Sequence, residues 1–171
     1  VLTWSEKDRQ YADEHLRILS GLYGMLRPLD GIYPYRFEMG YKMPTVPAKT
    51  TYEYWADSVV KTLPADGPII NLAAVEYSKI ITEYVAPERV IAPRFLTISP
   101  KTGQPTFVVV HAKIARGAFA RWLIVNQVSD TEQLQNFKEL NYEYSKKLST
   151  PVVPVFVCKT FGGLGLSVRL K

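Results

Sequence analysis

The sequence predicts a mixed α/β fold in a single domain, 1–171, with a central mixed sheet and surrounding helices. The chain has 171 residues, 47% of them hydrophobic and 22% charged, which is ordinary for one soluble domain. Apolar residues at helical spacing alternate with short β-rich apolar runs. Because no internal repeat interrupts this alternation, one α/β domain is the simplest arrangement.

The first half is predicted to contain three helices and one short strand. Ser5 can cap a helix over 5–21. After an irregular stretch, 52–63 has apolar residues at helical spacing and precedes a Pro/Gly turn. The run IINLA at 69–73 is typical of a buried strand, and the next helix is expected over 75–85.

The second half is predicted to begin with a hairpin that leads into a long helix. The runs 89–98 and 105–111 are rich in β-branched residues and are separated by SPKTGQ. That pattern is typical of a hairpin with a longer loop. A helix over 112–127 is expected to follow directly.

The C-terminal part is predicted to contain a capped helical turn and two strands. Ser129 and Glu132 form a capping-box pattern. The segments 142–145 and 152–159 have strand character, and Pro154 favours an edge position for the second one.

The net charge of +5 is concentrated in one segment. Between positions 89 and 129 there are six cations and no Asp or Glu, whereas the remainder has 15 cations against 16 anions. The six are Arg89, Arg94, Lys101, Lys113, Arg116 and Arg121. Such a patch suits a polyanionic ligand, and a solvated basic face is the plainer alternative.

The junction VVVHAKIARGAFARW predicts an anion site at the start of the long helix. A strand is expected to become a helix at about His111, which would leave free N–H groups at the sheet end. Lys113 and Arg116 in the first turns oppose the helix dipole, which indicates a negative group nearby. Gly117 suggests a closely approaching backbone or ligand, and Arg121 falls on the same side. The alternative is a solvated basic face.

The cysteine count and the apolar runs exclude several classes of protein. Cys158 is the only cysteine, which excludes an internal disulfide and a multi-cysteine metal site and fits a reducing cytosol. Its apolar strand predicts a buried, inert thiol. No run is long enough for a membrane helix, and no signal peptide pattern is present. Because the chain opens on Val1, we expect a piece of a longer protein or a chain whose first residues are missing.

Neither a metal site nor a catalytic set can be assembled from the sequence. The side chains that could be considered as iron ligands are His15, Glu38, Asp57, Glu76 and His111. Their spacing matches no metal-binding pattern, and we predict no metal and no cofactor. Asn71 and Glu76 flank a strand-to-helix turn, where active-site groups often lie, but no nucleophile, base and orienting group can be named.

Four segments resemble, in order and spacing, the YaaA family of bacterial peroxide-stress proteins. They are HLRILSGLYGMLRPLDGIYPYRFEMG, YEYWADSVV, INLAAVEYSK and AKIARGAFARWLI. The resemblance runs from about Trp4 to Lys159. It implies a cytoplasmic protein that helps cells survive hydrogen peroxide by lowering free iron. It also implies the family's own α/β fold, with a positively charged cleft that binds duplex or branched DNA without sequence specificity.

The chain departs from this family pattern at both ends. The resemblance implies an upstream leading strand and a helix-hairpin-helix segment, and neither is present in the sequence. The tail 160–171 continues past the usual family end, and no role is predicted for it. Protein partners are not predicted either.

Under the resemblance, the irregular stretch Gly21–Gly40 lines the cleft. Arg27 and Arg36 are then expected to present cations to DNA or another anion, with Asp30 and Glu38 orienting them by charge-assisted hydrogen bonds. The alternative is that Arg27–Asp30 and Arg36–Glu38 are mutual ion pairs that only hold the loop.

Two classes of function remain. The first is a DNA-binding stress protein whose cations contact phosphates. The second is an enzyme acting on a phosphate-containing small molecule or nucleic acid, with Glu76 or Asp57 as acid or base. Cations without an identifiable catalytic set favour the first class.

Overall fold

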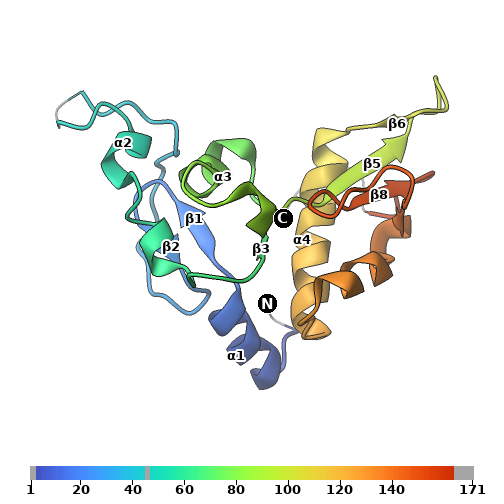
Figure 1. Ribbon diagram of the computed structural model, residues 1–171, viewed down its shortest axis with the longest axis horizontal. Helices are drawn as coiled ribbons and strands as arrows, with labels where there is room; N and C mark the ends of the chain where they lie inside the picture. The colour runs from blue at the N-terminus through green and yellow to red at the C-terminus, as the bar shows by residue number, and fades with distance from the viewer. Residues whose placement is uncertain (1–2, 45–46, 164–171) are drawn as a thin grey trace. The chain divides into compact units, whose positions relative to one another are not determined.

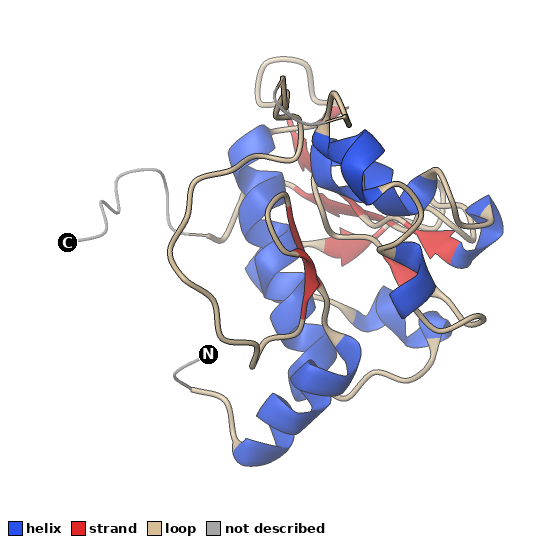
Figure 2. Cartoon of the chain, turned by 90° about the vertical axis from the view of Figure 1, so that its left-hand side faces the viewer, coloured by secondary structure: helices blue, strands red, loops and turns tan. Residues whose placement is uncertain are grey.

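The computed structural model describes residues 3–44 and 47–163. The chain forms two compact units, Val1–Val90 and Ile91–Lys171, and each is described by itself. Helices and strands alternate along the chain, which confirms the predicted mixed α/β class (Figure 1). Loops connect mostly short elements (tan in Figure 2). The single domain stays a prediction, and most of the 160–171 tail lies outside the described residues.

The first unit opens with helix α1, Glu6–His15. Ser5 caps it as predicted: its hydroxyl accepts from the Asp8 N–H, and the Asp8 carboxylate accepts from the Ser5 N–H. The predicted continuation to position 21 is wrong. Arg17 closes the helix end, because its guanidinium donates to the carbonyls of Asp13 and Leu16.

The residues after α1 form a short antiparallel hairpin. Strand β1, Ile18–Ser20, pairs with β2, Gly24–Leu26. Gly24 has a φ of +74°, and an added Cβ would lie 2.9 Å from the Trp55 ring. A glycine is therefore required at this turn. The stretch Gly21–Gly40 was predicted to lack strands, so β2 corrects that prediction for its first part.

The single helix predicted over 52–63 is wrong. The structure has α2, Thr51–Trp55, and a separate 3₁₀ turn η1, Val60–Thr62. They are separated at Ala56, whose φ of 43° is not helical. Trp55 explains the break, because its indole N–H donates to the Gly21 carbonyl at 2.9 Å and fixes the ring against the hairpin.

The rest of the first unit contains a predicted helix and a small sheet. Helix α3, Val75–Thr82, confirms the helix predicted over 75–85. Strand β3, Ile69–Ile70, pairs with β4, Val90–Ile91, which spans the boundary between the two units. The predicted strand over 69–73 is therefore shorter than expected. The 3₁₀ turn η2, Pro87–Arg89, precedes β4.

Arg89 has a structural role in the first unit. Its guanidinium donates to four backbone carbonyls, at 2.8–2.9 Å, in the turn before β3. The four acceptors are Pro64, Ala65, Asp66 and Gly67. One of the six clustered cations is therefore already used by the fold.

The second unit is built on a four-stranded mixed sheet in the order β6-β5-β8-β7. Its strands are β5 Arg94–Ile98, β6 Pro105–Thr106, β7 Glu143–Tyr144 and β8 Val155–Cys158. The β5–β6 hairpin confirms the hairpin prediction, and β5 runs parallel to β8. The edge position predicted from Pro154 is wrong. Strand β8 lies between β5 and β7, and Pro154 precedes its first residue, so the missing N–H of Pro154 falls outside the strand. The Pro154 carbonyl still accepts from the Arg94 backbone N–H.

Helix α4, Val109–Val125, packs on this sheet (Figure 1). The strand predicted over 105–111 is therefore too long, because only Pro105–Thr106 pairs as a strand and the helix begins at Val109. The core between helix and sheet is a cluster of buried aromatic rings. They are Phe95, Phe119, Phe137, Tyr142 and Phe156.

Two 3₁₀ turns connect α4 to β7. They are η3, Thr131–Asn136, and η4, Glu139–Asn141. Asp130 caps η3 by accepting from the Glu132 N–H, where Ser129 was the predicted cap. Within residues 3–44 and 47–163, no helix has the length and apolar character that crossing a membrane requires.

Candidate functional site

Three of the predicted cations of the second unit, Lys113, Arg116 and Arg121, share the outer side of α4, whereas Arg94 begins β5 and Lys101 lies in the β5–β6 turn. Lys113 and Arg121 are exposed and Arg116 is half-buried. Lys113, Gly117 and Arg121 are spaced by four residues, so they follow one another along the helix at steps of about 6 Å. Arg121 lies 3.8 Å from the Glu139 carboxylate, an exposed pair that contributes little. Among the described residues, Lys113 and Arg116 have no ion-pair partner.

The start of α4 changes the electrostatic argument. The helix begins at Val109, after an N-cap residue that makes no side-chain cap. Lys113 and Arg116 therefore lie farther from the helix start than predicted, beyond the first turn, where the dipole is weak. An added Cβ at Gly117 meets nothing within 4 Å in the described chain, so the predicted protein backbone contact is wrong. Approach of a ligand at Gly117 stays a prediction.

His111 lies inside α4 and belongs to a polar network, so it does not mark the helix start as predicted. Its Nδ1 is 2.9 Å from the Thr97 hydroxyl, and its ring stacks on Phe161 with centroids 4.0 Å apart. The Cys158 thiol donates to the same hydroxyl at 3.5 Å. Cys158 is buried, which confirms the predicted burial, and the inertness of its thiol stays a prediction. Burial is the main cause that raises the pKa of neighbouring Tyr142 to about 12.

Asp30 contacts the backbone of Arg27. Its carboxylate accepts from the Arg27 backbone N–H at 2.7 Å, and its own N–H donates to the Arg27 carbonyl at 3.2 Å. Among the described residues, no ion pair joins Arg27 to Asp30 or Arg36 to Glu38. The predicted side-chain pairs, whether orienting or structural, are therefore not formed. Asp30 closes a tight turn, and both arginines are exposed.

Asn71 and Glu76 hold the backbone around α3. The Asn71 side chain accepts from the Ala73 N–H at 3.1 Å, which forms an Asx turn before the helix. The Glu76 carboxylate accepts from the Gly40 N–H at 3.0 Å and so ties the end of the long loop to α3. Burial, Glu76 and Glu38, in that order, raise the pKa of Tyr77.

The remaining candidate ligands and acids are dispersed. Asp57 forms an ion pair with Lys61 at 2.8 Å, one turn away. His15, at the end of α1, packs on the Tyr11 ring. Within the part of the chain that the structure describes, no group of three or more His, Cys, Asp and Glu side chains could hold a metal ion.

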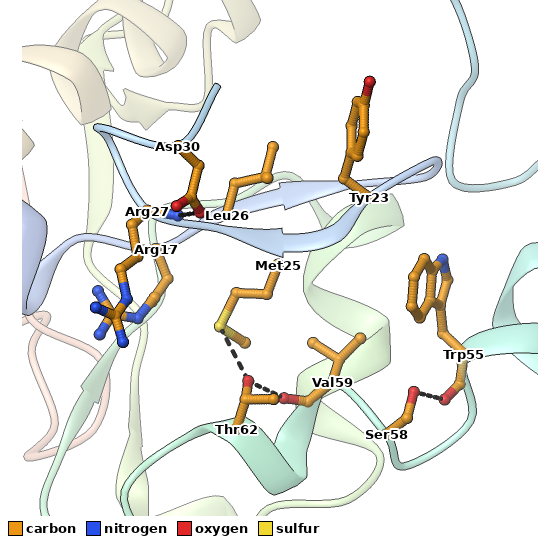
Figure 3. A pocket seen from close by; sticks show the side chains of 10 residues that line it. All are labelled: Arg17, Tyr23, Met25, Leu26, Arg27, Asp30, Trp55, Ser58, Val59 and Thr62. Atoms are coloured by element: carbon orange, nitrogen blue, oxygen red, sulfur yellow. Dashed lines mark hydrogen bonds between the residues drawn. The ribbon is translucent and has the colours of Figure 1, made fainter. Parts of the chain in front are cut away.

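The first unit also contains a hollow that the sequence interpretation missed. Its volume is about 280 Å³, and Arg17 and Arg27 both line it. Figure 3 shows the two guanidinium groups at the same end of the hollow, with Met25 and Thr62 in its wall. Arg17 was missed because a helix was expected there. The signal was present, since ILS and GML are short apolar runs that surround a glycine turn and are bounded on both sides by arginine.

Comparison with known protein families shows to which family the chain belongs. Residues 1–148 match a family model described as "Peroxide stress protein YaaA". The chain belongs to this family. The resemblance inferred from the four sequence segments is thereby confirmed.

Curated relatives carry the family name UPF0246. One from Salinispora tropica is 58% identical over 162 residues, which is 95% of this chain and 62% of that protein. Another from Roseobacter denitrificans is 44% identical over 89% of this chain and 61% of that protein. A third from Cupriavidus metallidurans is 38% identical over 90% of this chain and 62% of that protein. The YaaA-family chain thus spans about three fifths of the length of these relatives.

Proposed function

We propose that this peroxide-stress protein binds DNA in the bacterial cytoplasm through the phosphate backbone, without reading sequence. The observation that carries the proposal is the outer side of α4. Lys113, Arg116 and Arg121 surround the exposed Gly117, and Glu139 is the one carboxylate paired with them among the described residues. Lys113 and Arg121 lie about two turns apart, roughly 12 Å along the helix, and the absence of a side chain at position 117 lets a DNA strand lie close to the helix between them.

Backbone binding of this kind requires only exposed positive charge within reach of the phosphates. Contacts to phosphate oxygens position a protein on DNA and carry no sequence information. Each neutralised phosphate releases condensed cations, so affinity falls as salt rises. Arg27 and Arg36 in the first unit add two exposed cations to the same protein. The expected ligand is therefore any duplex or branched DNA.

The same counterion exchange connects DNA binding to iron. Ferrous ions belong to the cation atmosphere that phosphates attract, and a bound protein displaces that atmosphere. Radicals from the reaction of iron with peroxide would then form away from the DNA. This gives the proposal a route to lower iron-linked damage that requires no iron site on the protein.

The first experiment measures binding of a mixed-sequence duplex by fluorescence anisotropy at several salt concentrations. The test variant changes Lys113, Arg116 and Arg121 together to Gln. It should flatten the log–log salt slope by up to about three units. The matched control changes three exposed lysines of the same unit, Lys138, Lys146 and Lys147, to Gln. Equal slopes for the test variant and the control would exclude α4 from the interface.

The second experiment measures nicking of a supercoiled plasmid by ferrous iron and peroxide. The protein should protect the plasmid, the α4 triple variant should lose most of that protection, and the lysine control should keep it. Protection by the triple variant equal to that of the unchanged protein would contradict the link between phosphate binding and iron.

The enzymatic alternative has no supporting observation of its own. Its two proposed acid or base residues already have partners: Glu76 with the Gly40 N–H and Asp57 with Lys61. An overnight incubation with labelled DNA and nucleotides tests for turnover, and we expect none.

A further inference from the structure

We propose that Arg17 and Arg27 together form a binding subsite for a phosphate group in the first unit. The inference rests on the proposed function, because it names a second place where the protein binds phosphate. It concerns a discrete hollow, whereas α4 presents an open surface. The phosphate can belong to a mononucleotide or to a DNA strand, and the experiment separates these sources.

The register of the first hairpin brings the two arginines together. Ile18 pairs with Leu26, and Leu19 pairs with Met25. Continuing this antiparallel register by one residue places Arg17 directly opposite Arg27. Residues in such positions have Cβ atoms about 5 Å apart. Because side chains alternate along a strand, both arginines are expected on the same face as Leu19 and Met25, which packs on the core of the unit.

Like charges directly opposite each other destabilise a hairpin, and nearby carboxylates do not remove this repulsion. Asp30 also lines the hollow, but its carboxylate accepts from the backbone N–H of Arg27. The Asp13 carboxylate accepts from the backbone N–H of Leu29 at 3.3 Å. No ion pair to Arg17 or Arg27 is formed within the described residues. The lining keeps a net charge of +1, from two arginines and one aspartate, and a bound anion would relieve it.

The two guanidinium groups differ in how they are held. Arg17 is fixed, since Nη1 donates to the Asp13 carbonyl at 2.9 Å and to the Leu16 carbonyl at 2.8 Å. Arg27 is exposed, and within the described residues its side chain has no hydrogen-bond partner. A fixed and an adjustable guanidinium fit a phosphate well, because each planar group can donate two parallel hydrogen bonds to its oxygens.

The walls of the hollow determine which phosphate compounds fit. Its volume of about 280 Å³ exceeds what one phosphate group needs, and Met25, Val59 and Trp55 supply apolar surface (Figure 3). The Ser58 and Thr62 hydroxyls already donate to the backbone carbonyls of Trp55 and Val59. They therefore face a ligand as acceptors. A phosphate attached to an apolar or aromatic group with N–H donors, as in a nucleotide, matches this lining.

The test is a calorimetric titration at low ionic strength with inorganic phosphate and with adenosine monophosphate, supported by phosphorus NMR line widths. The test variant is Arg27→Gln, because Arg17 also caps α1. The control is Arg9→Gln, which removes an exposed arginine on α1 outside the hollow. Both ligands should bind saturably, with affinity about tenfold lower in Arg27→Gln and unchanged in Arg9→Gln. Arg27→Lys, which keeps the charge without the planar group, should be intermediate.

A second arm uses a short single strand with and without a 5′-phosphate. Preference for the phosphorylated strand, lost in Arg27→Gln, assigns the subsite to terminal phosphates. Equal binding of both strands with an equal loss in Arg27→Gln assigns it to backbone phosphates. Either result supports the subsite.

The subsite is overturned if neither phosphate nor adenosine monophosphate binds by either method, or if Arg27→Gln binds both as well as the unchanged protein. Duplex binding that depends on α4 would still leave the proposed function intact in that case. Conversely, saturable phosphate binding at Arg27 together with no duplex binding would overturn the proposed function and keep the subsite.

Discussion

The two units of the molecule hold their cations in different ways because they are stabilised differently. In the second unit, one aromatic cluster centred on Phe95 joins the sheet to α4. This packing fixes the position of the helix on the sheet, and Lys113, Arg116 and Arg121 lie on its outer side. The first unit depends more on side chains that bind loop backbone, such as Trp55, Glu76 and Arg89. Its candidate anion-binding cations, Arg17, Arg27 and Arg36, lie at a hairpin end and in a loop, and Arg17 and Arg27 line a hollow.

The largest loss of folding stability is expected in the aromatic cluster of the second unit. Phe95 is 1% exposed and contacts four other aromatic rings. Phe95→Ala should lower the free energy of unfolding by about 4 kcal/mol, because truncation of a buried Phe leaves a cavity. Denaturant unfolding measures this loss, and hydrogen exchange should show reduced protection in α4 and β5. A loss below about 1 kcal/mol would show that the aromatic cluster does not hold the unit.

The first unit should be most sensitive at Gly24. Gly24→Ala puts a side chain at a φ of +74° and a Cβ at 2.9 Å from the Trp55 ring. The left-handed backbone and the overpacking together should cost about 3 kcal/mol. Thermal unfolding measures the cost, and Gly31→Ala is the control, because an added Cβ there meets nothing within 4 Å. Equal melting points for the two variants would contradict the packing of Trp55 on the hairpin.

The elements of the fold differ in whether the sequence could predict them. The start of α1, helix α3, the β5–β6 hairpin and strands β7 and β8 follow from local signals such as the Ser5 cap. The failures have tertiary causes. Residues Ile18–Ser20 fit the helical pattern of the preceding segment, but in the fold they pair with β2 as a strand. The helix at Trp55 ends where the Trp55 indole N–H donates to the Gly21 carbonyl. Local propensity cannot show such partners.

Local sequence patterns likewise predicted some of the candidate site residues, whereas others depend on tertiary contacts. Periodicity alone placed Lys113, Arg116 and Arg121 on one side of a helix, and the structure agrees. Periodicity could not place Arg17 beside Arg27, because the two arginines become neighbours only when the β1–β2 hairpin forms. The start of α4 was also missed, since the β-branched run before His111 favours a strand locally, whereas packing on the sheet extends the helix to Val109.

Alkaline pH should weaken the second unit through Tyr142. This residue is fully buried, and burial raises its pKa from the ordinary 10.0 to about 12. A raised pKa in the folded state means that the stabilisation is complete below pH 10 and is lost as pH rises toward 12, by about 2 kcal/mol. Unfolding measured from pH 9 to 12 should show this loss, and Tyr142→Phe should reduce it. An identical pH dependence in the Phe variant would assign the loss to other groups.

The smallest change in stability is expected at Arg36, and that is what makes it informative. Arg36 and Glu38 are both exposed, and no ion pair joins them in the described residues. Arg36→Gln should therefore change the free energy of unfolding by less than about 0.5 kcal/mol. If the long loop contributes to the phosphate-binding surface, the same variant weakens duplex binding in anisotropy titrations at low salt, and the melt is preserved. Arg9→Gln, with the same charge change on α1, should leave binding as it was. A melting point lowered by many degrees with normal binding would show instead that Arg36 holds the loop and that the first unit presents anion-binding cations at its hairpin end alone.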